Sequence, residues 1–516
     1  MNVQEIIDDL IETSPKKSLP KIYSRTTISN RLKGKLLSYQ EPHVIKLVNT
    51  LLKHHVALDN SDTGIGKTYA SIGTAMELDR MPMVLCTKTT IPSWQNVLEY
   101  IGVKYYDIVN YETARHGKTY KNKKYTSRKK SPYIDLDDGV FRWTLPSNAI
   151  LIIDEVHKCK STSTEIGKLL MSTKQLIHAK IPVLMLSATV CEKIPDMKIP
   201  FYLFGLVDQP KNYNHYMKII TKNKYQQYKL SKQALLELKA NPVKYEEEMK
   251  NRSALIIYEE IKEYAARIRI KDLGDKFPSN QWCAQQFIAP EADEIAKAYE
   301  EIAELKRKLE ENPGSNHLAR IQKLKQEIEL RKIPIFIEQT QDYLENGKSV
   351  IIFVNYLDTL HILSEHLGIR CRVHGSQTTA ERQEAINLFQ SNQERIIICQ
   401  IRAGGVGISL HDLHGDHPRV TLINYPDRAS DLLQALGRAH RSGGKSPVLQ
   451  RIVFVANVDY EKKIMRSINR KLQNISAIND GDLTCHKYKV KKITKKSKNQ
   501  IPKKNNEDNE DDVDEI

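Results

Sequence analysis

A short stretch early in the chain combines glycines, a lysine and a threonine in the spacing of a phosphate-binding turn. Residues 59–68 have the sequence DNSDTGIGKT and lie between the apolar run 56–58 and a segment with helical spacing. In such a turn the backbone N–H groups point at phosphate oxygens, and the dipole of the following helix adds to the attraction. We expect Lys67 to reach the β- and γ-phosphates and the hydroxyl of Thr68 to bind magnesium. The predicted nucleotide-binding residues here are Thr63, Gly64, Ile65, Gly66, Lys67 and Thr68.

Two carboxylates provide the second half of the predicted nucleotide site. The stretch ILIIDEVHK (150–158) places Asp154 and Glu155 directly after an apolar run. Asp154 is expected to hold magnesium through its water shell, and Glu155 to polarise the attacking water. An Asp-Glu pair alone is common by chance, but its position downstream of the glycine-rich turn favours ATP and Mg²⁺ as cofactors. The chain has no Asn-Lys-x-Asp guanine-binding pattern, which weakens the interpretation as a GTPase.

Two groups of short apolar runs predict two parallel sheets that must position these residues. Strands covered on both faces are apolar almost throughout, and alternation with helical patterns predicts helices on both sides of each sheet. The expected fold class is therefore α/β, with two domains facing each other across a cleft. The runs are 55–59, 83–87, 106–111, 149–155 and 182–188 in the first group, and 349–356, 370–374, 395–400, 420–425 and 451–455 in the second.

The remaining segments set the expected domain boundaries. Apolar positions at helical spacing on both sides of the turn signal ENPGSN (311–316) predict a helical hairpin between the two sheets. The highly charged C-terminal end is expected to be disordered, and it is either a nuclear address, a DNA-tethering tail or a plain solvated tail. The expected parts are an N-terminal extension (1–30), a first domain (31–207), a helical insert or linker (208–345), a second domain (346–475) and a disordered tail (476–516).

Composition limits the classes of partner. No apolar run among the 516 residues approaches the roughly 18 to 20 residues of a membrane span. The seven cysteines are scattered singly, which favours a reducing, intracellular compartment. A net charge of +16 favours a polyanion, with nucleic acid first and an acidic membrane surface second, although plain solubility also explains such a charge.

Three further motifs resemble those of superfamily 2 helicases and translocases over about residues 30–470. They are Gln40 upstream of the turn, SAT at 187–189 and QALGRAHRSG at 434–443. The resemblance implies two tandem RecA-like domains and an adenine contact through Gln40. It also implies that Arg438 and Arg441 are arginine fingers, which stabilise charge on the γ-phosphoryl oxygens after the domains close. The residues expected to couple hydrolysis to closure are His157, Ser187, Thr189, Gly405 and Gln434.

Other stretches look like the Swi/Snf-type branch of this superfamily. RAGGVGISL (402–410) before the QALGRAHRSG motif is similar to its motif V, and VLCTKTTIPSWQNVL (84–98) to its motif Ia. Gly437 and the sequence HRSGG depart from that branch and lean toward strawberry-notch-like proteins and the DEAD/H-box helicases of large DNA viruses. The chemistry of His157 leaves two interpretations open, a buried structural histidine or a water-bridged coupling residue.

A basic segment at residues 115–130 is the main candidate for nucleic-acid contact. It carries eight Lys or Arg residues interleaved with Tyr120 and Tyr125, which could stack on bases. A solvated loop is the alternative. The candidate contacts there and in the motifs around 88 and 402 are Lys88, Lys121, Lys123, Lys124, Arg128 and Arg402.

Together these features predict an ATP-dependent motor that moves along DNA, with double-stranded DNA favoured. The alternatives are an RNA helicase with the same ATP site and, more remotely, a nucleic-acid-binding protein with an inactive motor. No membrane partner is expected, and the nucleus, a viral factory or a virion all remain open as locations.

Overall fold

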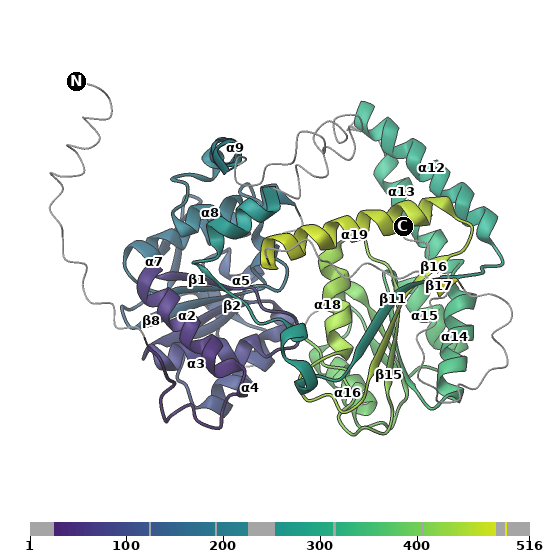
Figure 1. The fold of residues 1–516 in the computed structure, drawn as a ribbon, viewed down its shortest axis with the longest axis horizontal. Helices are drawn as coiled ribbons and strands as arrows, with labels where there is room; N and C mark the ends of the chain where they lie inside the picture. The colour runs from purple at the N-terminus through teal and green to yellow at the C-terminus, as the bar shows by residue number, and fades with distance from the viewer. Residues whose placement is uncertain are drawn as a thin grey trace.

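The computed structural model describes residues 25–122, 125–190, 193–224, 253–312, 316–404, 407–480 and 491–492. They form two domains, each built on a sheet of parallel strands with helices on both faces (Figure 1). This arrangement confirms the predicted α/β class with two sheets.

The first sheet has the strand order β10-β1-β9-β8-β2-β3, and every pairing in it is parallel. Successive side chains of a strand point to opposite faces, so β8 supplies Leu151 and Ile153 to one core and Ile150 and Ile152 to the other. Burial on both faces explains why these strands are apolar throughout. The strands are β1 (Val56–Asp59), β2 (Met81–Cys86), β3 (Asp107–Asn110), β8 (Ala149–Asp154), β9 (Val183–Leu186) and β10 (Ala265–Ala266).

Helices cover both faces of this sheet. One face packs against α2 (Gln40–His54), α3 (Lys67–Glu77) and α4 (Ile91–Ile101). The other face packs against α6 (Glu165–Ser172) and α8 (Lys198–Phe204). Further elements of this half include α5 (Tyr111–Ala114), α7 (Lys174–His178), α9 (Tyr213–Lys224) and the antiparallel hairpins β4–β5 (Lys118–Tyr120, Arg128–Lys130) and β6–β7 (Ile134–Asp137, Val140–Trp143).

The second sheet has the order β13-β14-β12-β15-β16-β11-β17, again with parallel pairings throughout. Its strands are β11 (Asn280–Phe287), β12 (Ser349–Val354), β13 (Cys371–Val373), β14 (Ile396–Gln400), β15 (Arg419–Asn424), β16 (Val448–Val455) and β17 (Lys491–Lys492). Its helices are α12 (Ala292–Glu311), α13 (His317–Leu330), α14 (Ile333–Glu345), α15 (Leu357–His366), α16 (Thr379–Gln390), α17 (Ile401–Gly404) and α18 (Ala429–Ala439).

The structure departs from the expected boundaries of the insert. Strand β11 lies within the range 208–345, yet it pairs with β16 along its whole length. Apolar residues of the helical hairpin, including Ile295 and Ile321, pack on the same core as Val350 of β12. Much of the expected insert is therefore part of the second domain. The sequence of β11, NQWCAQQF, lacks the apolar run of the other strands, so it gave no strand signal.

The C-terminal helix α19 (Asp459–Asp480) joins the two domains (Figure 1, yellow). Met465 and Leu472 belong to a core of the second domain, whereas Ala477 and Ile478 belong to a core of the first. The helix therefore extends into the range expected to be a disordered tail. Most of that tail, and most of the N-terminal extension, lies outside the described residues.

Candidate ATP site between the domains

The glycine-rich turn is the loop 60–66 between β1 and α3, here called the phosphate-binding loop. Gly64 and Gly66 have φ of +84° and +85°, which side chains with a Cβ rarely adopt. A Cβ at Gly66 would lie 2.4 Å from Nε2 of Gln40, and one at Gly64 would lie 3.0 Å from the carbonyl oxygen of His440. The loop therefore requires glycine at both positions for backbone conformation and for close approach.

Lys67 lies at the first turn of α3 and points back across this loop. Its Nζ donates hydrogen bonds to the carbonyl oxygens of Ser61 and Asp62, both at 2.9 Å. Burial lowers the pKa of Lys67, and the negative charges of Asp59, Glu155 and Asp154 oppose that shift. The lysine is thus positioned between the loop and the two carboxylates predicted to act on the nucleotide.

Gln40 is buried at the start of α2 and contacts the phosphate-binding loop at Ile65. Its Nε2 donates to the carbonyl oxygen of Ile65 at 2.9 Å, and its Oε1 accepts from the backbone N–H of Leu37 at 2.9 Å. The hydroxyl of Tyr39 donates to the same carbonyl of Ile65 at 3.1 Å. These contacts bring Gln40 to the phosphate-binding loop, and its contact with adenine stays a prediction.

Asp154 and Glu155 lie at the carboxyl end of β8, facing the loop. Burial and the neighbouring charge of Glu155 raise the pKa of Asp154. For Glu155, burial raises the pKa, but the hydrogen bond from His157 and the charges of His157, Lys67 and Arg438 outweigh it, so the pKa falls. Glu155 also has φ of +56°, a left-handed conformation that is strained for this residue type.

His157 connects the carboxylate pair with the SAT motif and with α18 of the second domain. Its Nδ1 lies 3.1 Å from Oε2 of Glu155 and 3.0 Å from Oγ of Ser187. Nε2 of Gln434 lies 3.2 Å from its Nε2, and the backbone N–H of Thr189 donates to Oγ of Ser187 at 3.2 Å. Four of the five predicted coupling residues therefore form one chain of contacts across the cleft, and the fifth, Gly405, lies outside the described residues.

Of the two predicted arginine fingers, Arg438 lies in the last turn of α18 and Arg441 follows the end of that helix. Arg438 donates to the carbonyl oxygen of Ile408 at 3.2 Å and lies close enough to the carboxylates for Glu155 and Asp154 to raise its pKa against the larger effect of burial. Arg441 donates to the hydroxyl of Ser409. Burial and the charge of Arg438 lower the pKa of Arg441 to about 9.

Gly437 lets α18 approach the phosphate-binding loop. A Cβ at this position would lie 2.0 Å from Oγ1 and 2.6 Å from Cβ of Thr63. The backbone N–H of Ser442 donates to the carbonyl oxygen of Gly64 at 3.3 Å. The departure of Gly437 from the Swi/Snf-type pattern therefore has a steric reason, because the helix has no room for a side chain here.

Sequence reasoning missed two groups of residues that hold the site. Nε1 of Trp94 donates to Oδ2 of Asp154 at 3.0 Å, and the hydroxyl of Tyr111 donates to the carbonyl oxygen of Asp154. Beneath the loop, buried Asp59 contacts Nε2 of His43 at 3.1 Å. Trp94 stood in a recognised motif, but only the fold shows that its indole reaches the carboxylate of Asp154.

In the second domain, the position that corresponds to the phosphate-binding loop is occupied by a carboxylate of the protein. After β12, the backbone N–H groups of Asn355 and Tyr356 donate to the carboxylate of Glu329, each at 3.0 Å, where α15 begins. A helix start of this kind attracts anions. A pocket of about 540 Å³ lies beside it and includes Lys306, Lys325, Arg402, Lys463 and Lys471 in its lining. Arg402 is exposed at this pocket.

The basic segment 115–130 is partly a hairpin rather than a loop. Its two tyrosines are partly buried against the core, with the rings of Tyr120 and Tyr125 5.2 Å apart and the hydroxyl of Tyr120 donating to Asn110 at 2.7 Å. Stacking on bases would require both rings to leave these contacts. Lys121 and Arg128 are exposed on this hairpin and Lys88 after β2, whereas Lys123 and Lys124 lie outside the described residues.

Gly437→Ala is expected to reduce ATP turnover by at least about tenfold, because the added methyl would prevent α18 from meeting Thr63. Alanine favours a helix over glycine by about 1 kcal/mol, so loss of the fold is not the expected cause. Turnover and thermal unfolding would be measured together. Gly375→Ala is the control, since only Oε1 of Gln400 lies near its Cβ, at 3.7 Å. Wild-type turnover by Gly437→Ala would contradict the packing described above.

Trp94→Phe is expected to lower kcat about tenfold and to raise the Mg²⁺ concentration needed for half-maximal turnover, because Asp154 loses a charge-assisted hydrogen bond. Trp143→Phe is the matched control, since it removes a 2.8 Å hydrogen bond to Ser172 outside the cleft. Equal behaviour of the two variants would show that the indole N–H has no role in positioning Asp154.

Comparison with known proteins identifies the family. Residues 331–443 match the helicase conserved C-terminal domain. The protein L364 of Acanthamoeba polyphaga mimivirus, provisionally named an ATP-dependent RNA helicase, is 60% identical over 493 residues, covering 94% of this chain and 90% of that protein. A human SWI/SNF-related regulator of chromatin, subfamily A member 1, is 32% identical over 139 residues, covering 25% of this chain and 13% of that protein.

Two solved structures also match. The SWI2/SNF2 ATPase core of Sulfolobus solfataricus in complex with double-stranded DNA is 17% identical, covers 90% of this chain and 96% of that one, and gives a TM-score of 0.31. The DUF1998 helicase MrfA bound to DNA is 12% identical, covers 91% and 55%, and gives 0.46. On the full-length similarity to the mimivirus protein, this chain belongs to the superfamily 2 helicases of the viral type and is an ATP-hydrolysing enzyme.

Proposed function

We propose that this helicase is a motor that couples ATP hydrolysis to movement along DNA. The observation that supports it best is the contact chain Glu155–His157–Gln434, which joins the catalytic carboxylate of one domain to α18 of the other. A change at the γ-phosphate that moves Glu155 would therefore also move His157 and Gln434, and with them α18 of the second domain. The relative position of two domains bound to one strand is the quantity that a motor must change.

In this proposal Lys67 binds the β- and γ-phosphates, Glu155 orients the attacking water, and Arg438 and Arg441 stabilise charge on the transferred group. Glu155 suits its role because its lowered pKa keeps it ionised at neutral pH.

Mg²⁺ fits the site as a cofactor. Hard oxygen ligands suit this cation, and a divalent charge beside Asp154 would offset the repulsion from Glu155 that helps to raise its pKa. The carboxylate of Asp154 and the hydroxyl of Thr68 would hold it, and the bound ion would neutralise phosphate charge during hydrolysis.

The proposed nucleic-acid contacts are the exposed basic residues Lys88, Lys121, Arg128 and Arg402. These side chains would bind backbone phosphates and release the counterions held there. Such contacts do not depend on the base sequence. Lys123 and Lys124 remain candidates on sequence alone.

A second candidate is movement along RNA, which the name of the mimivirus relative favours. Contacts with the phosphate backbone are common to both polymers. The choice therefore rests on which polymer stimulates hydrolysis.

ATP turnover measured alone and with double-stranded DNA, single-stranded DNA or RNA tests the function. Double-stranded DNA is expected to stimulate most. Lys67→Ala is expected to abolish turnover, and Glu155→Gln to bind ATP without hydrolysing it. Stimulation by RNA alone would replace the DNA proposal with the second candidate, and normal turnover by Lys67→Ala would refute the assignment of the site.

Arg128→Ala is expected to weaken polymer binding and to reduce the slope of log affinity against log salt by about one, because one phosphate contact is lost. Arg142→Ala on the neighbouring hairpin is the control, since its guanidinium already lies 4.0 Å from Asp137. An unchanged slope for Arg128→Ala would remove this hairpin from the proposed interface.

A further inference from the structure

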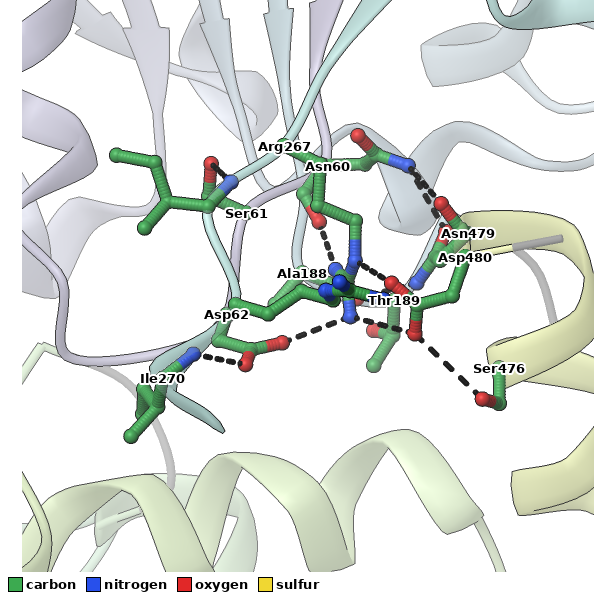
Figure 2. A network of polar contacts seen from close by, with 12 residues as sticks. Asn60, Ser61, Asp62, Ala188, Thr189, Arg267, Ile270, Ser476, Asn479 and Asp480 are labelled. Carbon is green, nitrogen blue, oxygen red and sulfur yellow. Dashed lines mark hydrogen bonds and ion pairs between the residues drawn. The ribbon is translucent and has the colours of Figure 1, made fainter. Parts of the chain in front are cut away.

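The C-terminal end of α19 lies beside the phosphate-binding loop, where it contacts the guanidinium group of Arg267 (Figure 2). Arg267 follows β10 and lies between two carboxylates, Asp62 of the loop and Asp480 of α19. Its Nη2 lies 2.8 Å from Oδ1 of Asp62 and 3.2 Å from Oδ2 of Asp480, and its Nε also donates to Asp480. Its Nη1 donates to the carbonyl oxygen of Asn60.

Asn479, the neighbour of Asp480, contacts two catalytic segments at once. Its Nδ2 donates to the carbonyl oxygen of Ala188, within the SAT motif, at 3.0 Å. Its Oδ1 accepts from Nδ2 of Asn60 at 3.3 Å. The last turn of α19 thus binds the loop and the SAT motif together, as Figure 2 shows.

The segment after Arg267 fixes the same loop from its other side. The backbone N–H of Ile268 donates to Oγ of Ser61 at 2.9 Å, and that of Ile270 donates to Oδ2 of Asp62 at 2.8 Å. The carbonyl oxygens of Ser61 and Asp62 are the two acceptors of Lys67. A displacement of Asp62 therefore displaces the groups that hold Lys67.

Burial makes this contact costly to break. The side chains of Arg267 and Asp480 are 16% and 8% exposed, so separation would leave two poorly hydrated charges. The first two thirds of α19 is packed in a core of the second domain, through residues that include Met465 and Leu472. Because a helix is stiff, a change in the position of the second domain would move Asp480 and Asn479 as well.

We propose that Arg267 is a positioning residue, through which the end of α19 sets the geometry of the Lys67 loop and the SAT motif according to the arrangement of the domains. It acts through Asp62 and Asn60 rather than on the nucleotide. The proposal rests on the proposed function in one respect, since coupling is observed as stimulation of ATP turnover by nucleic acid.

The test compares Asp480→Asn and Arg267→Lys with the wild-type protein. Asp480→Asn leaves Arg267 paired with Asp62, so basal turnover should stay within about twofold, while stimulation by the best polymer should fall about fivefold or more. Arg267→Lys disturbs both carboxylates, so it should also raise the KM for ATP. Ser476→Ala is the control, because it removes a 3.5 Å contact with Oδ2 of Asp480 and leaves both carboxylates in place to pair with Arg267.

A purely structural role would lower the melting temperature without changing the ratio of stimulated to basal turnover, so both quantities are measured for each variant. Full stimulation of Asp480→Asn with an unchanged KM for Arg267→Lys would overturn the proposal. If no polymer stimulates the wild-type protein, the proposed function fails instead. In that case the affinity of Arg267→Lys for a fluorescent ATP analogue decides, since weaker binding supports the positioning role and equal binding refutes it.

Discussion

Two adjacent, partly buried carboxylates, Asp154 and Glu155, set the electrostatic constraint on which the rest of the cleft depends. Their repulsion inside a poorly hydrated site must be offset by positive charge. Lys67 supplies part of that charge from the same domain, and Arg438 supplies part from the other. The contact between the domains is thus more than packing, because the second domain brings a cation that the first domain needs.

Close backbone approach allows these charges to meet. Gly437 lets α18 lie against Thr63, and Gly64 lets the loop accept the chain around His440. Neither glycine has a Cβ, and both lie where the two domains meet. The absence of these side chains allows the close approach that brings Arg438 near the carboxylates. His157 then joins the two sides by hydrogen bonds rather than by charge alone.

The two domains share an architecture but not a role. In the first, Lys67 is held by the loop after β1, which we propose as the nucleotide site. In the second, Glu329 occupies the start of α15 and takes the N–H groups of Asn355 and Tyr356. A carboxylate held there opposes the binding of phosphate, which argues for one nucleotide between the domains rather than one in each.

The sequence by itself determined the α/β fold class and both sets of apolar strands, and it predicted the nucleotide loop, the carboxylate pair and the two arginines, because each is a local pattern of residue types. It did not determine β11, whose sequence contains three glutamines and which is defined by its pairing with β16 and β17. Nor did it reveal the contact of Trp94 with Asp154 or the meeting of Arg267 with Asp480, 213 residues apart in the chain. Such contacts depend on how separate elements pack, so the tertiary structure alone decided them.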